Sequence, residues 1–292
     1  MRRTSLLVAI ALCALVSSCR GLPKLGQLAS PAPLPKAYRL TVGQLTYVSD
    51  FELPRDYKLI PELTAERDDI YQTLGLRPTT VPITVYLFRD AERYGAFLAR
   101  HFPNVPTRRA FFLKTDGGLA VYAHLSDRVT EDLRHEVAHG YLHAVMPEIP
   151  LWLDEGLAEY FEVPRSRGGL NRPHLALMSD MMEYEGWQPN LTRLESLQDS
   201  AQMDQRDYAE SWSWVYFMLR SDPQRREVLT AYLADLVLLN TPMGVEPISR
   251  RLGKLPTEPA QSLADYLMAT SEEQGIRTAQ QGAGSEEQRV RQ

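Results

Sequence analysis

The sequence predicts an α+β fold, in which a small mixed β-sheet lobe with helices is followed by an all-α lobe. Two observations lead to this prediction. Up to residue 129, short apolar runs with the spacing of strands alternate with segments that have the spacing of helices. From Thr130 onward the apolar pattern is helical almost throughout. Strands and helices followed by helices alone are typical of an α+β protein.

The sheet lobe opens with a strand pattern and then a helix pattern. Residues 37–51 (AYRLTVGQLTYVSDF) predict strands that turn at Gly43. Residues 58–74 carry leucine and isoleucine at the spacing of one helix face, and Gly75 follows as a helix-ending residue. We therefore expect a pair of strands and then a helix.

A further strand, a helix and a hairpin come next. The β-branched run at residues 81–88 (VPITVYLF) predicts a buried strand. Asp90 is placed to cap a helix that runs through Phe102. Residues 110–125 (AFFLKTDGGLAVYAHL) predict two strands joined by the turn sequence DGG.

A helix at the junction of the two lobes carries the sequence HEVAH. Thr130 is expected to cap this helix, and Pro147 to end it. At about 100° per residue, His135 and His139 lie about 40° and one turn apart, so their imidazoles can converge on one metal ion. Glu136 lies beside the first histidine, where its carboxylate can reach a water on that ion without ligating it. This is the H-E-x-x-H arrangement of zinc metallopeptidases.

The next segment offers a third ligand. A catalytic zinc takes three protein ligands and one open position. Residues 150–162 (PLWLDEGLAEYFE) predict a helix shortly after His139, from which Glu155 can return a carboxylate to the same ion. Glu159, one turn further on the same face, is expected to accept a hydrogen bond from a ligand histidine and to fix its tautomer. The apolar residues around both glutamates argue against a merely solvated acidic face.

HEVAH followed by WLDEGLAEYF resembles the gluzincins, the peptidase group that includes thermolysin-like and aminopeptidase-N-like enzymes. The resemblance implies that His135, His139 and Glu155 bind one zinc ion and that Glu136 is the catalytic base. The gap between the second histidine and the ligand glutamate is shorter here than in the aminopeptidases. No G-x-M-E-N-like exopeptidase motif precedes the site, so the resemblance does not extend to aminopeptidase specificity.

A third stretch, DYAESWSWVYFML at residues 207–219, is similar to the helix of aminopeptidase-N-like enzymes whose tyrosine stabilises the oxyanion. The match falls on Tyr208, which is expected at a helix start behind a capping Asp207. Glu210 and Ser211 stand where those enzymes have a Lys-Gly pair. The alternative, that Tyr208 is one more core tyrosine, remains open.

Two other histidines, His143 and His124, are expected near the site but not as metal ligands. His143 continues the four-residue spacing, but the third histidine of a metzincin would stand at Val145, so His143 is expected to pack against the site or support it. His124, on the second hairpin strand, is a candidate to line the cleft.

The N-terminus has the features of an export signal. Two arginines precede an apolar run that is too short to span a bilayer. Residues 16–19 (VSSC) resemble a bacterial lipobox, which implies cleavage before Cys19 and attachment of lipid to it. The alternative is a simple secretory signal cut near Ser18. Arg20, in place of an aspartate, favours the outer membrane by resemblance to Gram-negative lipoproteins.

These observations predict how the chain is organised. The expected parts are a signal peptide at residues 1–18, a Pro/Ala-rich tether at 19–36, a peptidase domain at 37–270 divided into lobes at 37–129 and 130–270, and a disordered polar tail at 271–292. The net charge is −5 and there is no basic run, which argues against a nucleic-acid partner.

The expected function is the hydrolysis of peptide bonds at the bacterial cell envelope. Zinc would activate water, Glu136 would take its proton, and Tyr208 would donate to the oxyanion. The strand at residues 120–125 is expected to pair with an extended peptide substrate by edge addition. Two alternatives remain: a catalytically silent scaffold lipoprotein that keeps the zinc fold, and an amidase that acts on cell-wall peptides.

Overall fold

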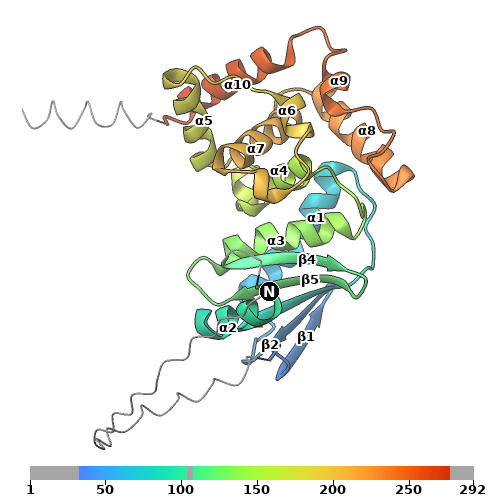
Figure 1. Cartoon of the computed structure of the whole chain (residues 1–292), viewed down its shortest axis with the longest axis vertical. Helices are drawn as coiled ribbons and strands as arrows, with labels where there is room; N and C mark the ends of the chain where they lie inside the picture. Colours follow the sequence, from blue (N-terminus) through green and yellow to red (C-terminus); the bar gives the residue numbers. More distant parts are fainter. Residues whose placement is uncertain (1–32, 104–107, 277–292) are drawn as a thin grey trace, which may run out of the picture. The chain divides into compact units, whose positions relative to one another are not determined.

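A five-stranded mixed sheet forms the first part of the computed structural model, which describes residues 33–103 and 108–276 (Figure 1). Its strands are β1 (Tyr38–Val42), β2 (Leu45–Ser49), β3 (Ile83–Phe88), β4 (Ala110–Thr115) and β5 (Gly118–His124). They lie in the order β1-β2-β3-β5-β4. β2, β3 and β5 run parallel, and β1 and β4 are antiparallel strands at the two edges. Only β1 and β4 therefore have an open side in the sheet.

The turns and helix ends of this lobe follow from local chemistry, as predicted. Gly43 has φ 58° in the turn between β1 and β2, and Gly75 has φ 68° at the end of α1 (Leu59–Leu74). Both values lie in the left-handed region that glycine adopts without strain. Asp90 caps α2 (Ala91–His101) by accepting the backbone N–H of Arg93 at 2.9 Å.

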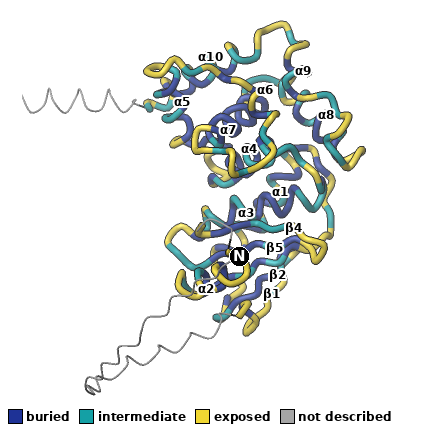
Figure 2. Tube along the Cα trace, in the orientation of Figure 1, coloured by how far each residue is buried: buried dark blue, intermediate teal, exposed yellow. Residues whose placement is uncertain are grey.

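Helices cover both faces of the sheet. Neighbouring residues of a strand point to opposite faces: Val121 of β5 joins the core formed with α1 and α3 (Val129–His143), and Tyr122 joins a separate aromatic core with Phe97 of α2. The buried residues drawn in Figure 2 follow the central strands. The face that carries α3 is the one that continues into the helical lobe.

The second part of the described chain consists of helices. They are α4 (Leu151–Glu162), α5 (Arg172–Tyr184), α6 (Leu191–Glu195), α7 (Gln205–Arg220), α8 (Pro223–Leu239), α9 (Ile248–Leu252) and α10 (Pro259–Glu273), with 3₁₀ turns at Arg165–Arg167 and Ser200–Gln202. The buried helix α7 lies at the centre and packs against α4, α5, α8 and α10. The predicted α+β fold class is confirmed.

α3 lies at the junction of the two lobes. It packs against β4 and β5 as closely as against α4, and Val137 and its apolar neighbours belong to the buried core. The helix begins after Arg128, not at a Thr130 cap, and it ends at His143, before Pro147.

Residues 271–273, which were assigned to the expected tail, belong to α10 (Pro259–Glu273). Within this helix, Ser271 is buried. The expected signal peptide, Cys19 and most of the tether lie outside the described residues, as do residues 277–292. Within the described ranges, no helix has both the length and the apolar character that crossing a bilayer requires.

Gly156 marks a close approach between α4 and α7. A Cβ atom at this position would lie 2.5 Å from the backbone oxygen of Ser211. Because the obstructing atom belongs to the backbone, a change of rotamer cannot relieve the contact. We predict that Gly156→Ala lowers the free energy of unfolding by about 2 kcal/mol or more, as measured by urea denaturation.

Gly95, in the middle of α2, provides the matched control. Nothing lies within 4 Å of a Cβ atom built there. Gly95→Ala should therefore raise stability by about 0.5–1 kcal/mol, the usual gain in a helix interior. Equal effects of the two substitutions would contradict the packing argument.

Candidate metal centre

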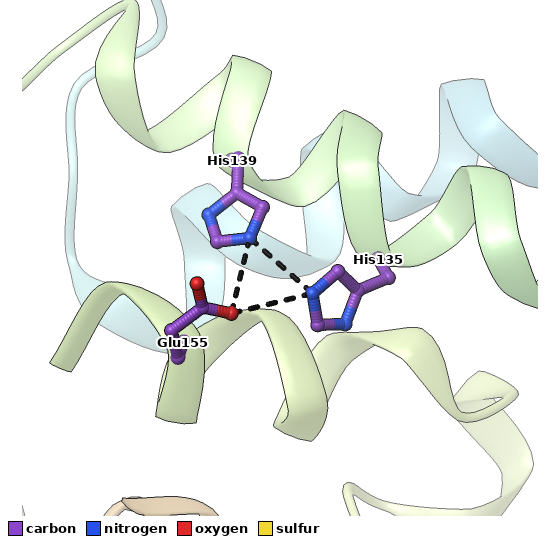
Figure 3. A group of neighbouring side chains, drawn as sticks. All are labelled: His135, His139 and Glu155. Carbon is purple, nitrogen blue, oxygen red and sulfur yellow. Dashed lines mark hydrogen bonds and ion pairs between the residues drawn. The ribbon is translucent and has the colours of Figure 1, made fainter. Parts of the chain in front are cut away.

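Three donor atoms from two helices meet at one point (Figure 3). His135 and His139 lie one turn apart on α3, and Glu155 lies in the second turn of α4. The two histidine Nε2 atoms are 3.3 Å apart. Oε2 of Glu155 lies 3.5 Å from Nε2 of His135 and 3.6 Å from Nε2 of His139. The structure thus brings together the three residues that the sequence singled out as metal ligands.

The dimensions of this triangle suit a small cation. The point equidistant from the three atoms lies about 2.0 Å from each, and zinc bonds to histidine nitrogen and carboxylate oxygen measure about 2.0–2.2 Å. The two contacts to the Glu155 oxygen are too long for good hydrogen bonds. Two imidazoles and a carboxylate are also the donor set of many catalytic zinc sites. The residues present therefore fit a zinc ion.

A carboxylate contacts the opposite nitrogen of each histidine. Nδ1 of His135 lies 3.2 Å from Oε2 of Glu162, and Nδ1 of His139 lies 3.0 Å from Oδ1 of Asp154. The contact of Glu162 is a hydrogen bond that keeps the proton on Nδ1 of His135 and leaves its Nε2 lone pair free for a metal, whereas the contact of Asp154 with His139 is an ion pair. Sequence reasoning missed both carboxylates. A signal was available, because Asp154 directly precedes Glu155 and Glu162 follows it by two helical turns.

Glu159 does not make the contact expected of it. Its Oε2 lies 2.8 Å from Nε2 of His174, and Asn171 at the N-cap of α5 donates to both Glu159 and Glu162. The reason is the way α3 crosses α4, which sets His135 against the last turn of α4. Glu162, and not Glu159, therefore makes the hydrogen bond with a donor histidine that was expected of Glu159.

Arg134 fixes that last turn of α4. Its buried guanidinium donates to three backbone carbonyls at the end of the helix, those of Phe161, Glu162 and Val163, at 2.6–2.9 Å. Such carbonyls have no partner within their own helix. Nη1 of Arg134 also lies 3.1 Å from Glu62 of α1. Arg134 thus fixes the backbone of the helix end that carries Glu162, the residue whose carboxylate contacts His135.

Burial and charge act in opposite directions on the donor residues. Burial acts to lower the pKa of His139, but Asp154 and Glu155 outweigh it and raise the pKa to about 10. Burial acts to raise the pKa of Glu155, but its contacts with His135 and His139 lower the pKa to about 2. Glu155 is therefore ionised at neutral pH, as a metal ligand must be.

Glu136 lies beside the donors and faces a cavity. Burial raises the pKa of Glu136, and the neighbouring His135 and His139 offset only part of that rise. The backbone of Phe112 in β4 also acts to lower this pKa. Together with His135 and His124, Glu136 lines a cavity of about 500 Å³. A carboxylate whose pKa is raised toward neutrality is suited to general-base catalysis.

Tyr208 lies in the first turn of α7, whose cap is Asp204 and not the expected Asp207. Asp204 accepts two backbone N–H groups, and Asp207 bonds back to the N–H of Asp204 at 2.9 Å. Burial, and then the charge of Glu155, raise the pKa of Tyr208 to about 12. The half-buried phenol therefore keeps its proton at neutral pH and can donate it in a hydrogen bond.

The open sheet edge beside the site belongs to β4. The strand at residues 120–125 was expected to offer this edge, but β5 is paired on both sides, with β3 and with β4. The hairpin folds β4 back on the outside of β5. In an antiparallel pair, hydrogen-bonded and non-hydrogen-bonded residue pairs alternate along the strands. Counted from the pair Thr115 and Gly118 that closes the turn, Phe112 falls in a non-hydrogen-bonded pair, so its N–H points away from β5 toward the open edge.

His143 contributes through Asp154. Its Nε2 lies 2.9 Å from Oδ2 of Asp154, so this carboxylate bridges His139 and His143. The His143 ring also stacks on Phe112 with centroids 5.3 Å apart. His143 lies outside the donor triangle and contacts it through Asp154.

Comparison with known proteins gives one family. The sequence profile of a family described as "Protein of unknown function (DUF1570)" matches residues 130–237. The matched segment contains the three donors, Glu136 and Tyr208, and covers less than half of the chain. No curated protein matches this sequence. The similarity therefore covers the helices of the metal centre without naming an activity.

The contacts of the two outer glutamates predict different effects on metal binding. Glu162→Gln removes the charge at Nδ1 of His135 and should weaken zinc binding about 10–100-fold. Glu159→Gln changes the same group one turn away, opposite His174, and should weaken zinc binding less than about threefold. Competition with a chromophoric zinc chelator measures both affinities. An equal or larger loss for Glu159→Gln would overturn the assignment of Glu162.

Proposed function

We propose that this protein is a zinc-dependent peptidase of the bacterial cell envelope. The observation that carries the proposal is the convergence of His135, His139 and Glu155 beside a cavity that also contains Glu136. The resemblance of these segments to gluzincins agrees with it. The lipobox-like sequence ending at Cys19 supports a location outside the cytoplasmic membrane.

The chain holds the metal and orients its ligands. When bound, zinc supplies a Lewis acid that makes water nucleophilic near neutral pH and polarises a carbonyl group. His135, His139 and Glu155 hold it. Glu162 keeps the imidazole ring of His135 in the tautomer that presents Nε2, and Asp154 forms an ion pair with His139.

Glu136 transfers the proton, and Tyr208 stabilises the negative charge that develops on the carbonyl oxygen. Glu136 accepts the proton of the attacking water and passes it to the nitrogen of the leaving amine. Its raised pKa makes it a stronger base than an ordinary glutamate. Tyr208 keeps its proton at neutral pH and donates a hydrogen bond to the carbonyl oxygen as negative charge develops there.

An extended peptide is the substrate that fits the surroundings. β4 offers outward backbone groups along an open edge, with which a peptide can pair as an added strand. The cavity at the start of β4 has apolar walls at Tyr94 and Leu98 and a positive charge at Arg108. Backbone pairing accepts many sequences, and the cavity selects among side chains.

The principal test is removal of the base. Glu136→Gln keeps the shape of the side chain but cannot accept a proton, so turnover of an unstructured protein substrate should fall by about 10²–10⁴-fold. Zinc content should remain one per chain, as measured by elemental analysis. The double variant His135→Ala/His139→Ala should lose both zinc and activity.

Several results would contradict the proposal. Wild-type turnover by Glu136→Gln, or zinc retained in full by the double histidine variant, would remove its basis. Release of peptides from purified cell wall, without cleavage of unstructured protein, would replace the peptidase by a cell-wall amidase.

Tyr208→Phe tests the oxyanion role separately. Loss of one donor to a developing oxyanion lowers kcat by about 10²–10³-fold. We expect a fall of this size in kcat with little change in KM and in zinc affinity, since Tyr208 is outside the donor triangle. Steady-state kinetics on one peptide measures both constants. Tyr216→Phe, on the same helix and away from the metal group, is the control and should keep wild-type kcat.

A further inference from the structure

The end of α8 exposes an unusual concentration of apolar side chains. In the described part of the chain, nine large hydrophobic residues are exposed, and four of them lie within residues 237–243. Leu238 and Met243 are 80% and 84% exposed, and Val237 and Leu239 are 42% and 49% exposed. We call residues 237–243 the apolar tip. Single exposed leucines are ordinary on protein surfaces, whereas the largest apolar patch of a protein is often functional.

The apolar tip is held in a definite shape. α8 buries Leu233 and Leu236 against the rest of the lobe, so the residues that follow on its last turn face away from the core. Asn240, with φ 56°, ends the helix in the left-handed region, and its N–H donates to the carbonyl of Leu236 at 2.8 Å. The N–H of Val245 donates to the carbonyl of Pro242 at 3.1 Å. The exposure is therefore a feature of the fold.

We propose that the apolar tip inserts into the surface of the lipid bilayer to which Cys19 anchors the protein. This inference goes beyond the peptidase proposal. It depends on the membrane anchor contained in that proposal and is independent of the metal centre.

The length of the tether makes the bilayer reachable. Thirteen residues separate Cys19 from Pro33, the first described residue. Fully extended, they span at most about 50 Å. A domain of about 240 residues has a diameter of about 45 Å. The domain is therefore confined within roughly its own diameter of the membrane, and it can turn any face toward the lipid.

The size of the apolar tip favours lipid over a second copy of the chain. A stable protein interface covers about 800 Å² on each partner, and four side chains at one helix end cover on the order of a few hundred Å². Insertion of a few apolar side chains into the headgroup region needs no complementary surface, and it adds to the affinity that the lipid anchor provides.

A fluorescent label at residue 238 tests the proposal. Cys13 and Cys19 are the two cysteines of the sequence. In the proposed mature chain, which lacks Cys13 and carries lipid on Cys19, Leu238→Cys introduces the sole free thiol. An environment-sensitive dye on this thiol should shift to shorter wavelength and brighten several-fold when the lipidated protein joins phosphatidylethanolamine/phosphatidylglycerol vesicles. The same dye on Val81→Cys, at a residue that is 42% exposed, is the matched control and should change little.

Each other outcome overturns the proposal. A dye at residue 238 that stays in water on the vesicles, or that responds no more than the one at residue 81, excludes insertion of the apolar tip. A shift that appears without vesicles and grows with protein concentration assigns the apolar tip to a second copy. A mature mass without lipid removes the anchor on which the inference depends and leaves the metal centre untouched.

Discussion

The close packing of α4 between α3 and α7 is the constraint on which the candidate site depends. α4 carries Glu155 together with the two carboxylates that orient the histidines, so a small shift of this helix would displace all three. Gly156 lets α4 approach the backbone of α7, and Arg134 ties the last carbonyls of α4 to α3. A glycine and an arginine, neither of them a donor, thus set the dimensions of the donor triangle.

The buried carboxylates around the site need a positive charge among them. Asp154, Glu155 and Glu162 surround His135 and His139 in a largely buried space, where an uncompensated carboxylate is costly. Without a metal, the histidines compensate by holding protons, which is why the pKa of His139 is raised to about 10. A divalent cation at the centre of the donor triangle provides the same compensation and leaves the histidines neutral. The cluster therefore favours a cation, and the sheet edge and cavity beside it favour a peptide.

The local sequence was sufficient to predict the features that depend on the periodicity of a single helix or strand. The spacing of His135 and His139 puts both rings on one face of a helix wherever that helix lies, because 3.6 residues make one turn. Gly43 and Gly75 predicted their turn and helix end because only a few residues adopt a positive φ without strain. Glu155 was within reach because a short turn brings α4 straight back to α3. The fold class followed from the same local patterns.

Only the tertiary structure decided which neighbour each group meets. The choice of Glu162 over Glu159 as the partner of His135 depends on how two helices cross. The choice of β4 over β5 as the open edge depends on the order of strands far apart in sequence. The exposure of Leu238 depends on which side of α8 the rest of the lobe covers. Periodicity specifies directions within one element, whereas packing between elements decides what lies in each direction.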